Sequence, residues 1–308
     1  MNIEKEKAAI ERLKAFVPKN GDPYFVCYSG GKDSDCIRIL ASLAGVPFEL
    51  HHNLTTVDAP ETISYVKSIP GIIIDKARYA NGKPKTMWNL IVRKKMPPLR
   101  YARWCCSELK EVGGKGRLKV TGVRWAESVA RSKRSGLVQI SGKSKSTQKY
   151  LEENGISHSI NKFGGVVLNH DNSESRRAVE HCYRTTSTLI NPIIDWSDYE
   201  VWDFLRYYGC FGNPLYYCGQ SRIGCVGCPL SGFRRMKLDF MQYPKYKKLY
   251  ISAFQKMVDE RNRLGLFNNG VWGDGLSVFK WWTGDNPEQL TMFSDSELEE
   301  IYNDMGVV

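Results

Sequence analysis

The seven residues from 28 to 34, Tyr-Ser-Gly-Gly-Lys-Asp-Ser, constrain the fold of this chain more than any other segment. They follow a short apolar run and precede a helical pattern that starts at Asp33. Two adjacent glycines allow the backbone N–H groups to converge on an anion, and the following helix directs its positive end to the same point. Lys32 adds a full positive charge, and Ser29 and Ser34 add hydroxyl donors. We therefore expect a phosphate-binding loop between a strand and a helix.

The residues around this loop alternate between strand-like and helical patterns. Short apolar runs predict strands, and apolar residues at helical spacing predict helices. The expected strands are residues 24–27, 48–53, 71–75 and 118–123, and the expected helices are residues 4–16, 33–44, 60–68 and 86–95. This order is typical of an α/β fold with a doubly wound, mostly parallel sheet, which binds its ligand at the carboxyl ends of the strands.

The sequence suggests three parts. Residues 1–134 are expected to form the N-terminal part of a nucleotide-binding α/β domain. In residues 135–188 the periodicity fades into a Ser-, Gly- and Lys-rich stretch, which we interpret as an inserted basic loop or lid. Residues 189–308 are expected to complete the domain and to add a helical, cysteine-rich extension, with helices at residues 244–264 and 295–305.

Composition limits the class of protein. Of the 308 residues, 42% are hydrophobic and 25% are charged, which is ordinary for a globular protein. The sequence has no apolar run long enough to span a membrane and does not start with a secretory signal pattern, so we expect a cytoplasmic protein without a membrane partner. In that compartment, nine cysteines favour metal or redox chemistry over disulfide bonds.

The net charge of +11 is concentrated in one segment. Residues 115–149 contain ten basic residues and one acidic residue, a net charge of +9. The phosphates of a nucleotide would use two or three of these charges, and the remainder would suit a polyanion such as tRNA or DNA. The alternative is a solvated basic loop without a partner.

Residues 29–34 resemble the PP-loop of the adenine-nucleotide α-hydrolase superfamily, and further segments resemble its PAPS reductase family. Residues 122–131 are similar to the G-x-R-x-x-E-S-x-x-R segment of that family, and residues 191–196 and 213–216 are similar to its P-I-x-D-W and N-P-L-Y segments. The resemblance implies an adenine-nucleotide site in which Lys32 and Asp33 are catalytic. The implied nucleotide-binding residues are Tyr28, Ser29, Gly30, Gly31, Lys32, Asp33, Ser34, Gly122, Arg124 and Arg131.

Two cysteine pairs form a second candidate site. Cys105 and Cys106 are adjacent, and Cys225 and Cys228 form a C-x-x-C followed by proline. Four thiolates suit either a [4Fe–4S] cluster or a structural zinc ion. The pattern resembles the cluster ligands of assimilatory adenylyl-sulfate reductases, which favours the cluster. If the ligand set is that of DndC-like DNA sulfurtransferases, Cys218 replaces one member of the Cys105–Cys106 pair as a metal ligand. The remaining alternative is that the cysteines are reduced thiols that bind no metal.

Departures from the family pattern bear on the substrate. Thioredoxin-dependent sulfonucleotide reductases use a nucleophilic cysteine in an E-C-G-x-H context and tend to lose the lysine of the loop. No cysteine follows Cys228 here, and Lys32 is present. Both features favour ATP over PAPS or APS. With ATP, Mg²⁺ offsets the charge of the departing pyrophosphate, and Lys32 stabilises the same oxygens.

Three functional hypotheses follow. The first is a PP-loop ATP pyrophosphatase that adenylylates an acceptor, in one form for sulfur transfer to tRNA or DNA with a sulfur-donor protein. The second is a sulfonucleotide reductase that acts on PAPS or APS and releases sulfite. The third is a non-catalytic nucleotide-binding module with a redox or regulatory role.

Overall fold

The computed structural model describes residues 1–142, 144–266 and 270–285. The chain divides into two compact units. Unit 1 comprises residues 1–52, 60–75 and 113–223, and unit 2 comprises residues 53–59, 76–112 and 224–308. The helix expected at residues 295–305 lies outside the described residues.

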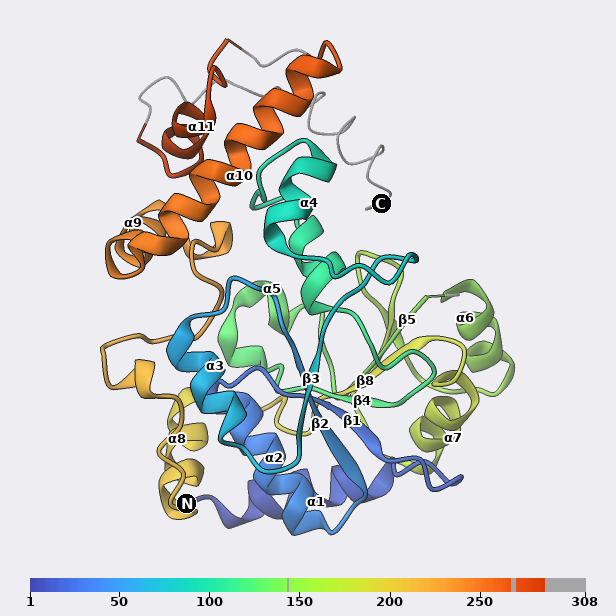
Figure 1. The fold of residues 1–308 in the computed structure, drawn as a ribbon. Helices are drawn as coiled ribbons and strands as arrows, with labels where there is room; N and C mark the ends of the chain where they lie inside the picture. Colours follow the sequence, from blue (N-terminus) through green and yellow to red (C-terminus); the bar gives the residue numbers. More distant parts are fainter. Residues whose placement is uncertain (143, 267–269, 286–308) are drawn as a thin grey trace. The chain divides into compact units, whose positions relative to one another are not determined.

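Unit 1 is built on a central sheet (Figure 1). Its described strands are β1 (Tyr24–Cys27), β2 (Phe48–Asn53), β3 (Ile72–Asp75), β4 (Lys119–Val120), β5 (Val138–Ser141), β6 (Ser159–Ile160), β7 (Val166–Leu168) and β8 (Ser187–Ile190). Their order across the sheet is β3-β2-β1-β4-β8-β5-β7-β6. β1 pairs in parallel with β2 and β4, and β4 pairs in parallel with β8, whereas β5, β7 and β6 are antiparallel additions. The predicted α/β fold with a mostly parallel sheet is confirmed.

Helices flank the sheet of unit 1. The described helices of this unit are α1 (Ile3–Ala15), α2 (Lys32–Ala44), α3 (Pro60–Lys67), α5 (Val129–Ser132), α6 (Ser144–Glu153), α7 (Ser173–Cys182) and α8 (Asp198–Tyr207). β1 is almost entirely buried, as expected of a central parallel strand. α2 buries Ile37 and Leu40 against it, and α8 adds Phe204 to the same core. This packing fixes the start of α2 at the carboxyl end of β1.

The segment expected to be a loop, residues 135–188, contains regular structure instead. It holds β5, β6, β7, α6, α7 and the start of β8. The strands are only two to four residues long, too short to show an alternating pattern. α6 and α7 are rich in polar residues, and α7 buries mainly small side chains such as Ala178 and Ser175, so neither shows a broad apolar stripe. The boundaries of the three predicted parts remain a prediction.

Unit 2 is helical. Its described helices are α4 (Met87–Lys94), α9 (Phe233–Gln242), α10 (Pro244–Arg263) and α11 (Gly275–Trp282), with a π-helical turn at Cys106–Lys110. α10 packs against α4 and α11 through aromatic side chains, and the ring of Tyr250 lies 4.7 Å from that of Trp282 and 5.1 Å from that of Trp88. The predicted helix at residues 244–264 is confirmed. No helix in the described part of the chain is long and apolar enough to cross a membrane.

Candidate functional site

The loop of residues 28–34 turns sharply between β1 and α2 in unit 1. Gly30 has a φ of 76°, a conformation that residues with a Cβ atom rarely adopt. A Cβ atom on Gly31 would lie 3.3 Å from the hydroxyl of Tyr216. The Ser34 hydroxyl accepts a hydrogen bond from the Gly31 N–H at 3.1 Å and so caps α2. Within the described residues the N–H groups of Ser29 and Gly30 have no acceptor, as an anion-binding loop requires.

Two side chains from a distant segment support the loop. The hydroxyl of Tyr216 accepts a hydrogen bond from the Lys32 backbone N–H at 2.9 Å. The Asn213 side chain donates to the Gly30 carbonyl at 3.1 Å and to the Thr62 hydroxyl at 3.1 Å. Both belong to the N-P-L-Y segment, which the sequence analysis used only for the family resemblance. Their contact with the loop connects residues more than 180 positions apart.

A network of two cations and two carboxylates follows the loop. The Lys32 ammonium lies 3.4 Å from Asp33 and 3.5 Å from Asp198. The guanidinium of Arg124 donates to Asp33 at 2.7 Å, to Asp198 at 2.5 Å and to the Trp196 carbonyl at 3.0 Å. Partial desolvation raises the pKa of Asp198, but the Arg124 hydrogen bond and the Lys32 charge outweigh it, and the pKa is lowered. The sequence analysis did not identify Asp198 as a site residue.

Arg124 is therefore engaged by the protein itself. It is only 1% exposed, and its three hydrogen bonds all go to protein acceptors. Gly122 contributes by its lack of a side chain, since a Cβ atom there would lie 2.8 Å from the Cβ atom of Asp33. Arg131 forms a 3.3 Å ion pair with Glu127, whose other carboxylate oxygen accepts a hydrogen bond from the Arg124 backbone N–H at 3.0 Å.

Tyr28 places its backbone at the loop and its side chain in the core. Its hydroxyl donates to Asp35 at 2.6 Å, and the hydroxyl of Tyr65 donates to the other oxygen of the same carboxylate at 2.9 Å. Burial, and next the charge of Asp35, raise the pKa of Tyr28. The Tyr28 side chain thus supports the first turn of α2.

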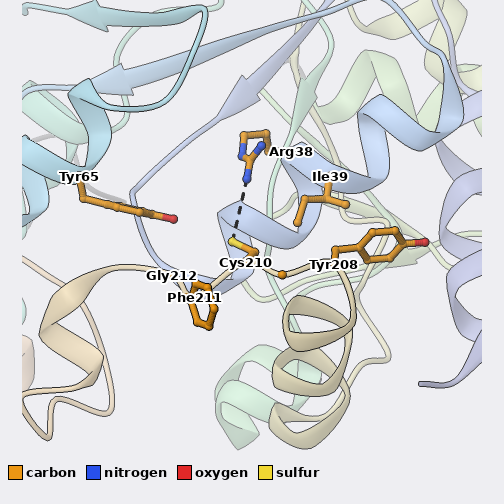
Figure 2. Close-up of a pocket in the computed structure, with 8 residues that line it drawn as sticks. Arg38, Ile39, Tyr65, Tyr208, Cys210, Phe211 and Gly212 are labelled. Atoms are coloured by element: carbon orange, nitrogen blue, oxygen red, sulfur yellow. Dashed lines mark hydrogen bonds between the residues drawn. The ribbon is translucent and has the colours of Figure 1, made fainter.

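A pocket of about 430 Å³ lies beside α2 (Figure 2). Its lining residues are Arg38, Ile39, Tyr65, Tyr208, Gly209, Cys210, Phe211 and Gly212. Arg38 donates to the sulfur of Cys210 at 4.0 Å. None of the residues predicted to bind the nucleotide lines this pocket.

The two cysteine pairs lie in unit 2. Cys225 forms an isolated bridge with Asp58, and the Val226 N–H donates to the Val57 carbonyl at 2.8 Å, so the C-x-x-C segment is anchored to residues 57 and 58. Cys105 and Cys106 sit at the start of the π-helical turn. Cys218 belongs to unit 1 and is exposed.

The four thiols of the two pairs influence one another. A hydrogen bond with Cys106, burial, and the neighbouring Cys225 and Cys228 raise the pKa of Cys105. The hydrogen bond from Cys105 and another from Arg103, whose Nη2 lies 3.4 Å from the sulfur, lower the pKa of Cys106 to about 6. Within the described residues, no three Cys, His, Asp or Glu side chains are arranged to hold a metal ion.

Lys110 is a further charged residue of this region that the sequence analysis did not single out. Desolvation lowers the pKa of its ammonium, but Cys225, Cys106 and Asp58 raise it more, and the net shift is upward. The interaction is mutual, since burial raises the pKa of Cys225 to about 12 while Lys110 lowers it. A positive charge therefore lies near the thiols. Lys110 follows Cys106 by four residues on the π-helical turn, and this closeness in sequence could have identified Lys110 as a residue of the cysteine site.

Comparison with known proteins agrees with this geometry. Residues 23–231 match the phosphoadenosine phosphosulfate reductase domain. The chain belongs to this family. Two uncharacterized proteins of Methanocaldococcus jannaschii are 26% and 24% identical over 251 and 274 residues, which cover 77% and 87% of this chain. The match covers only 47% and 49% of those proteins, so the chain spans about half the length of these relatives.

A third relative has an assigned activity. The adenosine 5′-phosphosulfate reductase of Allochromatium vinosum is 49% identical over 39 residues, which are 13% of this chain and 15% of that protein. Together with the family match, this relationship supports a nucleotide-binding enzyme of sulfur-related chemistry.

Proposed function

We propose that this protein is a PP-loop ATP pyrophosphatase that adenylylates an acceptor. The observation that carries the proposal is the Lys32 ammonium beside a loop whose Ser29 and Gly30 N–H groups have no acceptor in the described residues. Such a loop binds phosphate oxygens through backbone N–H groups, and an adjacent lysine stabilises the charge that develops on a leaving pyrophosphate. The presence of Lys32 favours ATP over a sulfonucleotide.

The reaction is a substitution at the α-phosphorus of ATP. The acceptor forms a bond to the α-phosphorus while the bond to the oxygen that bridges to the β-phosphate breaks, and pyrophosphate leaves with that electron pair. Lys32 would contact the pyrophosphate oxygens. Arg124 would act as a positioning residue, because its guanidinium donates to Asp33, Asp198 and the Trp196 carbonyl.

Mg²⁺ and a [4Fe–4S] cluster are the cofactors proposed for this reaction. Asp33 and Asp198 would hold Mg²⁺, because carboxylate oxygens together with substrate phosphates are its usual ligands. Cys105, Cys106, Cys225 and Cys228 would hold the cluster, with zinc as the lesser alternative and Cys218 as the alternative ligand. Four thiols are the usual donor set of such a cluster, and Cys106, Cys225 and Cys228 lie near enough to Cys105 to raise its pKa. A bound cluster would supply a redox-active centre.

Nucleic acid is the acceptor that the charge distribution favours. Lys133 and Lys145 have no ion-pair partner within the described residues, and a basic surface of this kind attracts phosphates. In this form the enzyme would act with a sulfur-donor protein and transfer sulfur to tRNA or DNA in the cytoplasm.

A sulfonucleotide reductase is the second candidate, and the short similarity to the Allochromatium vinosum enzyme favours it. Anaerobic incubation separates the two reactions. With ATP and single-stranded or transfer RNA, the first proposal requires pyrophosphate. With adenosine 5′-phosphosulfate and a thiol reductant, the second requires sulfite. Release of sulfite without any release of pyrophosphate would reject the first proposal.

A further inference from the structure

An exposed phenylalanine lies between β6 and β7 in unit 1. Among the exposed large apolar side chains of the described residues, Phe163, at 68% exposure, is the one whose ring has cations over it. The Lys162 ammonium lies 4.9 Å from the centre of its ring, and the Arg134 guanidinium lies 5.6 Å from it. We call these three residues the Phe163 platform.

The Asn161 side chain holds the turn that carries Phe163, and Gln148 adds a hydrogen bond to the Gly164 carbonyl at 3.4 Å. Asn161 is only 9% exposed, and its side-chain oxygen accepts hydrogen bonds from the N–H groups of Phe163 and Gly165, each at 3.0 Å. The Asn161 N–H donates to the Gly165 carbonyl at 2.8 Å, and Gly164 has a φ of 76°. The ring is therefore presented by an ordered turn.

Arg134 is held independently. Its Nε donates to the Ala130 carbonyl at 2.9 Å, and no other hydrogen bond of its guanidinium is present within the described residues. The next residue is fixed as well, because the Ser135 carbonyl accepts a hydrogen bond from the indole of Trp125 at 2.7 Å. The terminal nitrogens of Arg134 thus remain free to bind an anion beside the ring.

We propose that the Phe163 platform binds an unpaired base of a single-stranded nucleic acid. The base stacks on the ring, and Arg134 and Lys162 contact the adjacent phosphates, as in proteins that bind single strands through aromatic and cationic side chains. A duplex is a poorer fit because its bases are already stacked. A lipid surface is also a poorer fit, because the strength of interfacial binding scales with the apolar area that is inserted, and a single ring supplies little of it.

The inference rests on the proposed nucleic-acid acceptor and specifies the form of that acceptor. The basic segment alone fits any polyanion, whereas an exposed ring between two cations selects a partner that has both phosphates and free aromatic faces. Glu127, the one acidic residue in the basic segment 115–149, is already paired with Arg131 and so opposes an anionic partner little.

The test is fluorescence anisotropy with labelled oligonucleotides at several salt concentrations. The probes are a 15-nucleotide poly-dT strand, a matching oligo-U strand and a 15-base-pair duplex. Phe163→Ala should weaken single-strand binding about 5- to 150-fold, the effect of one lost stacking contact, without changing the salt slope. Phe163→Tyr should retain binding, and Arg134→Gln should reduce the salt slope by about 0.7.

Phe211→Ala is the matched control, because Phe211 is 76% exposed and no cation lies over its ring within the described residues. It should bind like the wild type. Circular dichroism of each variant checks the fold, and Phe163→Leu repeats the test with a side chain that keeps apolar bulk. Absence of binding by the wild type, equal affinity of Phe163→Ala and the wild type, or preferential binding to vesicles of anionic phospholipid would each overturn the inference.

The proposed function is tested separately by pyrophosphate release. If Phe163→Ala loses single-strand binding but the wild type releases no pyrophosphate, the inference about the Phe163 platform is supported and the proposed ATP reaction is rejected. If the wild type releases pyrophosphate but Phe163→Ala binds single strands as tightly as the wild type, the proposed ATP reaction is supported and the inference about the Phe163 platform is rejected.

Discussion

At the scale of single residues, Arg124 organises the carboxylates that adjoin the loop of residues 28–34. Its guanidinium is buried and donates to Asp33 and Asp198, while Lys32 approaches the same two carboxylates from the loop. A guanidinium suits this position because its planar group of donors reaches several acceptors at once. The arrangement keeps Asp33 at a fixed orientation directly after the loop.

Replacement of Arg124 should therefore reduce stability. Arg124→Met removes the guanidinium and leaves two carboxylates that only Lys32 neutralises. We expect the free energy of unfolding to fall by about 3 kcal/mol. This value is at the lower end of the range for a broken buried ion pair, because Asp198 is largely exposed. Urea denaturation at neutral pH measures the change. The double variant Arg124→Met, Asp198→Asn should recover part of the loss, and a single variant as stable as the wild type would contradict this role.

At the scale of secondary-structure elements, α8 carries Asp198 and is joined to α1. Its N-terminus has a capping box in which the Ser197 N–H donates to Glu200 at 2.7 Å and the Glu200 N–H donates to the Ser197 hydroxyl at 3.2 Å. Lys5 of α1 donates to the same Glu200 carboxylate at 2.9 Å. The cap therefore fixes both the start of α8 and its contact with α1.

Glu200→Gln should destabilise the protein in a pH-dependent manner. Burial raises the pKa of Glu200, but the Ser197 N–H and Lys5 outweigh it and lower the pKa to about 2. A carboxyl whose pKa is lowered on folding stabilises the fold above its ordinary pKa, and that stabilisation is lost as the pH falls towards 2. We expect a loss of about 1 kcal/mol at pH 7 that shrinks below pH 4.5.

Thermal unfolding at pH 7 and at pH 3 measures this difference. Glu11→Gln is the control, because Glu11 is 66% exposed in an ion pair within α1. If the difference in stability between Glu200→Gln and the wild type is the same at pH 7 and at pH 3, the charge of Glu200 does not stabilise the fold, which contradicts this prediction.

The two cysteine pairs lie on separate segments of unit 2, and the proposed cluster would connect them. Anaerobically purified protein should contain about four irons per chain and absorb broadly near 400 nm. Cys225→Ser or Cys228→Ser should lose the iron and destabilise unit 2, because metal binding and folding are coupled. Metal analysis and absorption spectra measure both effects, and one zinc without iron would reject the cluster.

Cys218→Ser distinguishes the two ligand sets. If the four proposed ligands are correct, this variant should keep its iron while Cys106→Ser loses it. The opposite result would assign Cys218 in place of one member of the Cys105–Cys106 pair.

At the scale of the whole molecule, local signals predicted the fold well and long-range contacts could not be predicted. The strand, loop and helix at residues 24–44 are encoded within about twenty consecutive residues, so their pattern was sufficient. Asp198 and Tyr216 reach the same loop from more than 160 positions later. Tyr216 belongs to the N-P-L-Y segment used for the family resemblance, but neither residue's local sequence shows that its side chain contacts the loop. The strands of residues 135–188 were missed because tertiary pairing, more than periodicity, holds such short segments.

The role of Arg124 shows a second limit of sequence reasoning. A motif indicates that an arginine is available to bind an anion, but it does not reveal whether protein acceptors already use its donors. Here they do. The division into two units is similarly invisible, because each unit is assembled from three separate stretches of the chain.

The most direct test of the central claim is to follow two labels through the reaction with ATP. ATP labelled at the α-phosphorus or at the γ-phosphorus is incubated with Mg²⁺ and single-stranded nucleic acid, and products are separated for the wild type, Lys32→Ala and the surface control Lys14→Ala. We expect the γ label in pyrophosphate and the α label in AMP or in the adenylylated acceptor. Lys32→Ala should weaken ATP binding about 30-fold, as expected for one lost charge-assisted hydrogen bond, and should abolish release. Release of the γ label as orthophosphate, or unchanged activity of Lys32→Ala, would contradict the proposed ATP pyrophosphatase.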